Sequence, residues 1–165
     1  MSVKLTNVEG ILAVDLLNGL AKNETIPWKS KNDLSFFKQK TLNNTVVMGS
    51  KTLLSLPNAM PLKNRTNIVI TNNKEKYSNM YKTIHNILFL DMKETLYFMR
   101  TNTSNKFFVI GGNQIYNELL QYCSTIWLTK IKKNYDCDLI FKYDISTYTK
   151  EIIHEDTELE IMCLC

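Results

Sequence analysis

The sequence predicts an α/β fold: a single domain with a central, mostly parallel twisted sheet, an antiparallel C-terminal edge and helices on both faces. Up to about Tyr122, short apolar runs alternate with amphipathic stretches of helical spacing, as in parallel strands joined by helical crossovers. The rest of the chain carries strand-like runs, which favour an antiparallel edge. A length of 165 residues with 44% hydrophobic content suffices for one core, so we expect one domain over residues 1–165.

The strands are predicted from apolar runs that stop at polar residues or glycine. The first run stops at Asp15 and the Asn18-Gly19 pair, and a long loop follows to about Asn32. Carboxyl ends of parallel strands meet at one edge, where we expect ligands to bind. The predicted strands are Ile11–Val14, Thr45–Met48, Asn67–Thr71, Asn86–Leu90 and Phe107–Ile110, then Thr125–Lys132, Tyr148–His154 and Glu158–Leu164 in the tail.

The helices are predicted from apolar spacing and from start and stop residues. Asn32 or Asp33 can cap the first helix, which places Asp33 and Phe37 on one face. Two prolines that follow Leu56 end the second helix. The predicted helices run from Asn32 or Asp33 to Thr41, over Ser50–Leu56, over Met92–Arg100 and over Asn113–Tyr122.

Composition and charge argue against several functional classes. The net charge is +4, and the lysines are scattered over loops, so we expect no nucleic-acid partner. The four cysteines form no C-x-x-C pair, so neither a metal site nor a disulfide framework is expected. The chain has no apolar run of about 18 residues, and its first ten residues lack a signal-peptide pattern. We therefore expect no membrane segment and a cytoplasmic location.

Four features are candidates for chemistry, and each has a structural alternative. The Gly111-Gly112 pair follows a strand and opens a helix, which suits a pyrophosphate but equally suits a tight turn. Asp33 either binds a donor-rich ring or is an exposed first-turn residue. Trp28 either belongs to a lid or anchors a loop to the core. Arg65 either holds a carboxylate or is a solvated surface charge.

Several short motifs stand in a characteristic order between Gly10 and Phe141. They are Ile11-Leu12-Ala13-Val14, Ile26-Pro27-Trp28, Asp33-Leu34, Phe36-Phe37-Lys38, Thr41, Val46-Val47-Met48-Gly49, Lys51-Thr52, Leu62-Lys63-Asn64-Arg65, Asn67-Ile68-Val69-Ile70, Val109-Ile110-Gly111-Gly112, Tyr116, Leu128-Thr129-Lys130-Ile131, Asp138 and Phe141. This order resembles that of the dihydrofolate reductase family. Independent motifs at matching intervals rarely coincide by accident.

The resemblance implies a folate site. Asp33 would bind the amino group and the adjacent ring nitrogen of the pteridine, with Thr129 in support, and Arg65 would hold the glutamate carboxylate. The implied catalytic residues are Asp33, Trp28 and Thr129. The implied substrate-binding residues are Ile11, Leu12, Asp33, Leu34, Phe37, Leu56, Leu62, Arg65, Ile110 and Thr129.

The resemblance also implies an NADPH site. Ala13 would bind the nicotinamide carboxamide through its backbone, and Lys51 and Thr52 would meet the pyrophosphate. In this family the two residues that match Gly111 and Gly112 are joined by a cis peptide. The implied cofactor-binding residues are Ala13, Leu20, Gly49, Ser50, Lys51, Thr52, Thr71, Asn72, Ile110, Gly111, Gly112, Asn113, Gln114, Ile115 and Tyr116. Few basic residues stand near the expected position of the extra phosphate of NADPH.

By the same resemblance, the chain would reduce 7,8-dihydrofolate to tetrahydrofolate, support thymidylate synthesis and bind antifolate-like molecules. A hydride would reach the carbon beside the imine nitrogen, which would take a proton through a water. The loop from Leu16 to Asn32 would close over the nicotinamide. We expect a monomer, which could associate with thymidylate synthase. The rival functions are a pyrimidine reductase of riboflavin synthesis and a binding module without catalysis.

Overall fold

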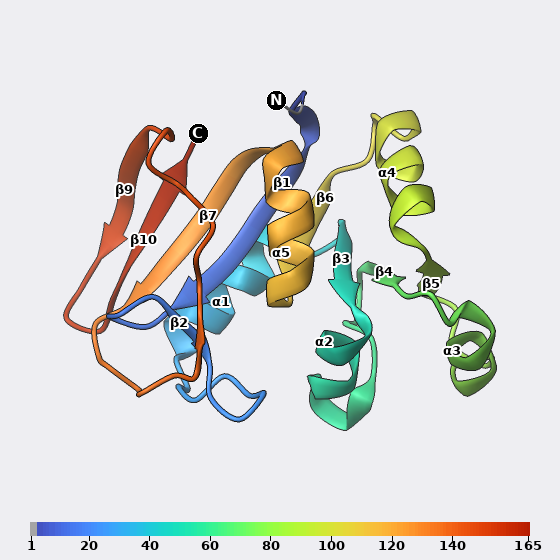
Figure 1. Ribbon diagram of the computed structural model, residues 1–165, viewed down its shortest axis with the longest axis horizontal. Coiled ribbons are helices and arrows are strands. Elements are labelled where there is room, and N and C mark those ends of the chain that lie inside the picture. The colour runs from blue at the N-terminus through green and yellow to red at the C-terminus, as the bar shows by residue number, and fades with distance from the viewer. Residues whose placement is uncertain (1–2) are drawn as a thin grey trace. The chain divides into compact units, whose positions relative to one another are not determined.

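The computed structural model describes residues 3–165, and the chain divides into two compact units. Unit 1 comprises Met1–Glu9 and Thr41–Ser124, and unit 2 comprises Gly10–Lys40 and Thr125–Cys165. The strand β1 (Leu5–Val14) contributes residues to both units. The elements of both units are labelled in Figure 1.

Unit 1 is the parallel part of the protein. Its strands are the first half of β1, β3 (Thr45–Gly49), β4 (Thr66–Ile70), β5 (Ile87–Leu90) and β6 (Phe107–Gly111). β3 pairs in parallel with β4 and with β6, and β4 pairs in parallel with β5. Its helices are α2 (Ser50–Ser55), α3 (Lys74–Met80), α4 (Met92–Thr101) and α5 (Asn113–Leu119), with 3-10 turns η1 (Pro57–Ala59) and η2 (Leu120–Tyr122).

Unit 2 is the antiparallel part. It contains the second half of β1, most of α1 (Lys31–Thr41) and of β7 (Cys123–Ile131), and all of β2 (Gly19–Ala21), β8 (Leu139–Ile140), β9 (Lys150–Glu155) and β10 (Leu159–Leu164). β10 pairs antiparallel with β7 on one side and with β9 on the other, as Figure 1 shows. Trp28, Ile131, Leu159 and Ile161 form its buried apolar cluster.

The strands follow the order β5-β4-β3-β6-β1-β7-β10-β9, and β2 pairs with β8 in a separate small sheet. The predicted α/β class, with a mostly parallel sheet and an antiparallel edge, is confirmed. The single domain over residues 1–165 stays a prediction. Within residues 3–165, no helix is both long and apolar enough to span a membrane.

The first strand is longer than the sequence predicts. β1 begins at Leu5, six residues before the predicted start at Ile11. Polar residues interrupt this stretch, but their partners lie far away in the sequence. The Glu9 carboxylate is buried and lies 3.1 Å from Lys106 Nζ, and Asn7 Nδ2 donates to Met99 O at 3.1 Å. Polar groups that are paired can be buried. A strand can therefore extend beyond its apolar run, as β1 does here.

Three short elements were missed, and two helices end early. The sequence predicts no helix or strand where α3, β2 and β8 lie. α3 has a single aromatic anchor, Tyr77, whose ring stacks on Phe89 of β5 at 5.7 Å; one anchor gives no periodic signal. The predicted helices Ser50–Leu56 and Asn113–Tyr122 end at Ser55 and Leu119. The second continues directly into the 3-10 turn η2, whereas the extended residue Leu56 separates the first from η1.

The turn after β1 is organised around Asp15. This side chain is only 1% exposed, and its Oδ1 accepts hydrogen bonds from Gly19 N at 2.7 Å and Leu17 N at 2.9 Å. Its Oδ2 accepts from Tyr135 N at 2.9 Å. Burial by itself raises the pKa of Asp15, but these backbone donors outweigh burial, and the net pKa lies below the ordinary value of 3.8.

We expect Asp15→Asn to remove a pH-dependent part of the stability. Because the folded-state pKa lies below the unfolded value of 3.8, the ionised carboxylate stabilises the fold above about pH 4 and loses that contribution as pH falls through the lower folded pKa. Urea unfolding between pH 3 and pH 7 measures the effect. The variant should be less stable than the parent at pH 7, and the difference should shrink toward pH 3. An equal loss at both ends would contradict this role.

Candidate active site

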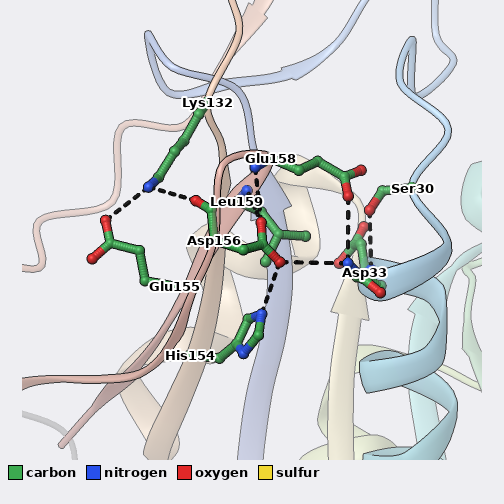
Figure 2. A network of polar contacts seen from close by, with 9 residues as sticks. Ser30, Asp33, Lys132, His154, Glu155, Asp156, Glu158 and Leu159 are labelled. Carbon is green, nitrogen blue, oxygen red and sulfur yellow. Dashed lines mark hydrogen bonds and ion pairs between the residues drawn. The ribbon is translucent and has the colours of Figure 1, made fainter.

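Asp33 lies in the first turn of α1, partly buried and close to polar side chains. Its backbone N–H donates to Ser30 Oγ at 3.1 Å, so Ser30 caps the helix and the expected cap at Asn32 or Asp33 is wrong. Ser30 has the right spacing because a cap oxygen binds the N–H three residues ahead. Figure 2 shows Ser30 and Asp33 together at this helix start.

Burial raises the pKa of the Asp33 carboxyl above its ordinary value of 3.8. The Trp28 side chain lowers this pKa, the negative charge of Glu158 raises it, and a hydrogen bond from Thr129 lowers it, but the upward shift prevails. Within residues 3–165, Asp33 makes no ion pair with a basic side chain. A partly desolvated carboxylate without a cation is costly, so it is available for a donor-rich ligand.

Trp28 is an anchor in the core and not an exposed lid residue. It is 5% exposed, belongs to the apolar cluster of unit 2, and its ring lies 5.7 Å from that of Tyr135. Its indole Nε1 is buried and has no hydrogen-bond partner of good geometry among residues 3–165. It nevertheless lies close enough to Asp33 to lower the pKa of that carboxyl. A buried N–H without a partner is uncommon and suits a ligand or a water beside Asp33.

Two glycine-containing turns meet at the carboxyl ends of neighbouring strands in unit 1. β3 ends at Gly49, and β6 ends at Gly111, which lies opposite Met48 in the parallel register. α2 begins directly after Gly49, and α5 begins after Gly112. The Gly111-Gly112 bond is cis, as the family resemblance implied.

The space around these turns is too small for added side chains. Gly111 has a φ of +117°, and a Cβ there would lie 3.1 Å from the Tyr116 hydroxyl and 3.2 Å from its ring. A Cβ on Gly49 would lie 3.1 Å from Ile115 Cγ1. Ile115 and Tyr116 are themselves buried, at 7% and 5% exposed. The backbone of both turns can therefore approach a ligand closely.

The same turns fit a dinucleotide. The buried Asn113 Oδ1, in the first turn of α5, has no hydrogen-bond partner among residues 3–165. Backbone N–H groups at the starts of α2 and α5 can bind phosphate oxygens. In α2, Lys51 is exposed and Thr52 Oγ1 lies 3.5 Å from the position of a Gly112 Cβ. These residues fit the NADPH that the resemblance implied.

Arg65 is held in a fixed position just before β4. Its Nε donates to Lys63 O at 2.9 Å, and its Nη1 donates to Thr41 Oγ1 at 3.0 Å. Partial burial lowers the pKa of the guanidinium below its ordinary value of 12.5. No carboxylate within residues 3–165 forms an ion pair with Arg65, so its charge is available for an external anion.

Asn67, which the sequence reasoning did not select, holds the segment that carries Leu62 and Arg65. It is fully buried. Its Oδ1 accepts from Leu62 N at 3.0 Å, and its Nδ2 donates to Leu62 O at 3.0 Å and Arg65 O at 3.1 Å. An asparagine inside an otherwise apolar strand was the available signal, because buried amides normally satisfy a loop backbone.

A polar depression of about 520 Å³ lies at the opposite, amino end of the parallel strands. Thr45 and Thr66, the first residues of β3 and β4, line it together with Arg65 and Lys106. It contains none of the glycine turns. Because parallel-sheet proteins bind their ligands at the carboxyl ends of the strands, the glycine turns are the candidate ligand site of unit 1, and Asp33 is the candidate of unit 2.

The remaining predicted site residues differ in exposure. Ile11, Leu12, Leu20, Thr71 and Thr129 are buried, with Thr129 at 2% exposed. Thr71 Oγ1 accepts from Asn73 N at 3.0 Å. Leu34 is 66% exposed, on the outside of α1. Half-buried residues are Ala13, Phe37, Gly49, Ser50, Thr52, Leu56, Leu62, Ile110, Gly112 and Asn113, and exposed ones are Lys51, Asn72 and Gln114.

The fold is that of an α/β protein with glycine turns at the carboxyl ends of parallel strands, the end at which such proteins bind their ligands. The family model for dihydrofolate reductase matches residues 7–160. The chain therefore belongs to the dihydrofolate reductase family, whose members are NADPH-dependent oxidoreductases that reduce dihydrofolate to tetrahydrofolate.

Relatives and a solved structure agree with this assignment. A dihydrofolate reductase of Buchnera aphidicola is 31% identical over 92% of this chain and 91% of its own length. A bifunctional dihydrofolate reductase-thymidylate synthase of Paramecium tetraurelia is 36% identical over 82% of this chain, which spans 28% of that protein. The dihydrofolate reductase of Enterococcus faecalis, solved with NADP(H) and RAB-propyl, superimposes with a TM-score of 0.74 at 27% identity, over 99% of this chain and 96% of that one.

Proposed function

We propose that this chain reduces 7,8-dihydrofolate to tetrahydrofolate with NADPH, and that Asp33 binds and polarises the pteridine ring. The observation that carries the proposal is the partly buried Asp33 carboxylate, which has no basic partner within residues 3–165 and lies near the orphaned Trp28 N–H. A pteridine presents an amino group and a ring N–H side by side. One carboxylate can accept hydrogen bonds from both.

Asp33 acts by orientation and charge. NADPH, when bound, supplies the hydride that reaches the carbon of the C=N bond. The imine nitrogen takes a proton, so the double bond becomes a single C–N bond with one new C–H and one new N–H. The ionised Asp33 favours positive charge on the ring as that proton arrives. Trp28 Nε1 can hold the water that delivers it, and Thr129 keeps the carboxylate in place.

The cofactor is proposed to bind along the glycine turns. Ser50, Lys51 and Thr52 at the start of α2 would hold the pyrophosphate, and Gly111 and Gly112 would let the nicotinamide approach the sheet. Tyr116 would support it from below Gly111. Leu20 and Ala13 would close the nicotinamide side, and Thr71 and Asn72 would flank the adenosine phosphate.

The Leu16–Asn32 loop is proposed to move with ligand binding only in part. Its first part is fixed, because β2 pairs with β8 and the Asp15 carboxylate accepts a hydrogen bond from the Gly19 backbone. Ile26 is 64% exposed, whereas Trp28 is buried. The exposed segment around Ile26 is therefore the part free to cover the nicotinamide, while Trp28 stays in the core.

Arg65 is proposed to bind the glutamate carboxylate of the substrate. We expect Arg65→Lys to raise the KM for dihydrofolate roughly 10- to 100-fold with little change in kcat, because an ammonium cannot form the two parallel hydrogen bonds of a guanidinium. A KM effect without a kcat effect reports binding shared by the ground state and the transition state. Steady-state kinetics with dihydrofolate, and with a pteridine that lacks the glutamate, measure it. An equal effect on both substrates would contradict this role.

We propose a cytoplasmic monomer that binds dihydrofolate and antifolate-like molecules and supplies tetrahydrofolate for one-carbon metabolism. Fusion of the reductase to thymidylate synthase in the Paramecium relative supports association with such a synthase. Analytical ultracentrifugation of the chain, alone and mixed with a thymidylate synthase, tests both the oligomeric state and the association.

The proposed reaction is tested by NADPH oxidation, followed by absorbance, on mixing the protein with dihydrofolate. Rapid oxidation that needs dihydrofolate supports the proposal. Oxidation only with a pyrimidine substrate of riboflavin synthesis would favour the rival reductase, and tight NADPH binding without turnover would favour a module that has lost catalysis. Repeating the assay with NADH measures the preference for the extra phosphate.

A further inference from the structure

The hairpin turn that joins β9 and β10 carries a fixed cluster of charged side chains. This β9–β10 turn consists of residues 156–158. Asp156 Oδ1 accepts from Glu158 N at 2.8 Å and from Leu159 N at 3.0 Å, and Oδ2 lies 2.9 Å from His154 Nε2. These contacts, the His154 hydrogen bond first, lower the pKa of Asp156 from 3.8 to about 2. Asp156 therefore stays ionised and holds the turn in one shape across the neutral range.

A lysine that directly follows β7, the strand paired with β10, fixes the turn from the other side. Lys132 Nζ donates to Asp156 O at 2.7 Å and forms an ion pair with Glu155 Oε2 at 2.8 Å. Figure 2 shows Lys132 and Glu155 on one side of the turn, and Glu158 extended in the other direction, toward Ser30 and Asp33. The turn thus separates its acidic side chains: Glu155 is neutralised by Lys132, and Glu158 faces the start of α1.

Asn32 connects the turn to the start of α1. Its Nδ2 lies 3.5 Å from Asp156 Oδ2 and 3.5 Å from Glu158 Oε2, and the next residue in the chain is Asp33. The negative charge of Glu158 raises the pKa of Asp33, and the nearby Trp28 and Thr129 side chains lower it. Glu158 makes no ion pair within residues 3–165, so its negative charge is not cancelled locally.

We propose that Glu158 is a positioning residue of the reductase: held by Asn32 and the β9–β10 turn, it keeps a negative charge beside Asp33 and thereby sets the acid limit of the pH range over which the enzyme works. The inference rests on the role proposed above for Asp33. Two like charges at short distance disfavour ionisation of the more buried one. Glu158 therefore makes Asp33 take up a proton at a higher pH than burial alone would cause.

The test compares Glu158→Gln with Glu155→Gln. Both variants remove one carboxylate from the same hairpin, but Glu155 faces Lys132 and not Asp33. The first readout is the titration of the Asp33 carboxyl carbon by NMR in the free protein, with Asp33→Asn used to assign the signal. We expect Glu158→Gln to move the Asp33 midpoint to lower pH and Glu155→Gln to leave it in place. Asn32→Ala should shift it in the same direction as Glu158→Gln.

The second readout is the pH profile of kcat/KM for dihydrofolate. Its acid limb should move to lower pH in Glu158→Gln, with kcat near neutral pH unchanged. Since the charge acts partly through solvent, the difference from the parent should shrink in 1 M salt, where the screening length is about 3 Å. An unchanged Asp33 midpoint in Glu158→Gln would overturn the inference. If the Asp33 midpoint shifts but the pH profile of kcat/KM does not, the effect of Glu158 on Asp33 is supported and the proposed role of Asp33 in the reaction is refuted.

Discussion

Asp33→Asn is expected to lower kcat for dihydrofolate by roughly 10²- to 10⁴-fold, the usual cost of losing a charged group that assists proton transfer. The amide keeps the shape of the side chain but not its negative charge. It also offers an N–H where the ring needs an acceptor. NADPH binding should be nearly unchanged, because the glycine turns of unit 1 do not include this residue. Stopped-flow kinetics and NADPH fluorescence titration separate the two effects.

The same substitution should not cost stability. Because the folded-state pKa of Asp33 is raised above 3.8, the carboxyl favours the fold below the unfolded value, and that contribution is lost as pH rises through the folded pKa. At pH 7 the ionised Asp33 therefore destabilises the fold. Asp33→Asn should melt at the same temperature as the parent or at a higher one. Below about pH 4 this advantage should vanish.

The matched control for Asp33→Asn is Glu75→Gln. Glu75 is also a carboxylate in the first turn of a helix, α3, but it is exposed. Its amide variant should keep full activity. If Asp33→Asn retained more than about a tenth of the parental kcat, or if it melted well below the parent at pH 7, the proposed role of Asp33 would be wrong.

Gly111→Ala is expected to cost about 1–3 kcal/mol of stability and to weaken NADPH binding on the order of tenfold or more. The backbone φ of +117° disfavours any residue with a Cβ, and that Cβ would lie 3.1–3.2 Å from Tyr116. Tyr116 is buried at 5% exposed, so its ring has little room to retreat. Displacing it disturbs the start of α5, where the cofactor is proposed to bind. Thermal unfolding and fluorescence titration with NADPH measure the two losses.

Gly112→Ala is the matched control, because it adds the same methyl group one residue later. A Cβ on Gly112 would make only an ordinary contact of 3.5 Å with Thr52 Oγ1, and its φ of −81° suits any residue. This variant should fold with nearly the parental stability, whatever its effect on NADPH. Equal destabilisation of the two variants would show that the positive φ and the Tyr116 contact are not what make Gly111 necessary.

The sequence predicted the structure best for elements that depend on residues close together in the chain. Apolar runs located β3, β4, β5 and β6 within one or two residues at each end, since strands of a parallel sheet are mostly apolar. It was least informative where partners are distant. Glu9 looked like a break in β1 until Lys106 reached it, and Asn67 looked like a strand end until the segment around Leu62 and Arg65 packed onto it.

By itself, the sequence determined the fold class, the family and the identity of the chemical groups: a carboxylate at the start of a helix, a glycine pair after a strand, and an arginine before another strand. The surroundings of these groups, by contrast, come from the tertiary structure alone. It buries Trp28 in the core, caps α1 with Ser30, and brings Glu158 to Asp33 across 125 residues of chain. Burial and charge at a side chain are set by residues that are distant in sequence, and no local pattern encodes them.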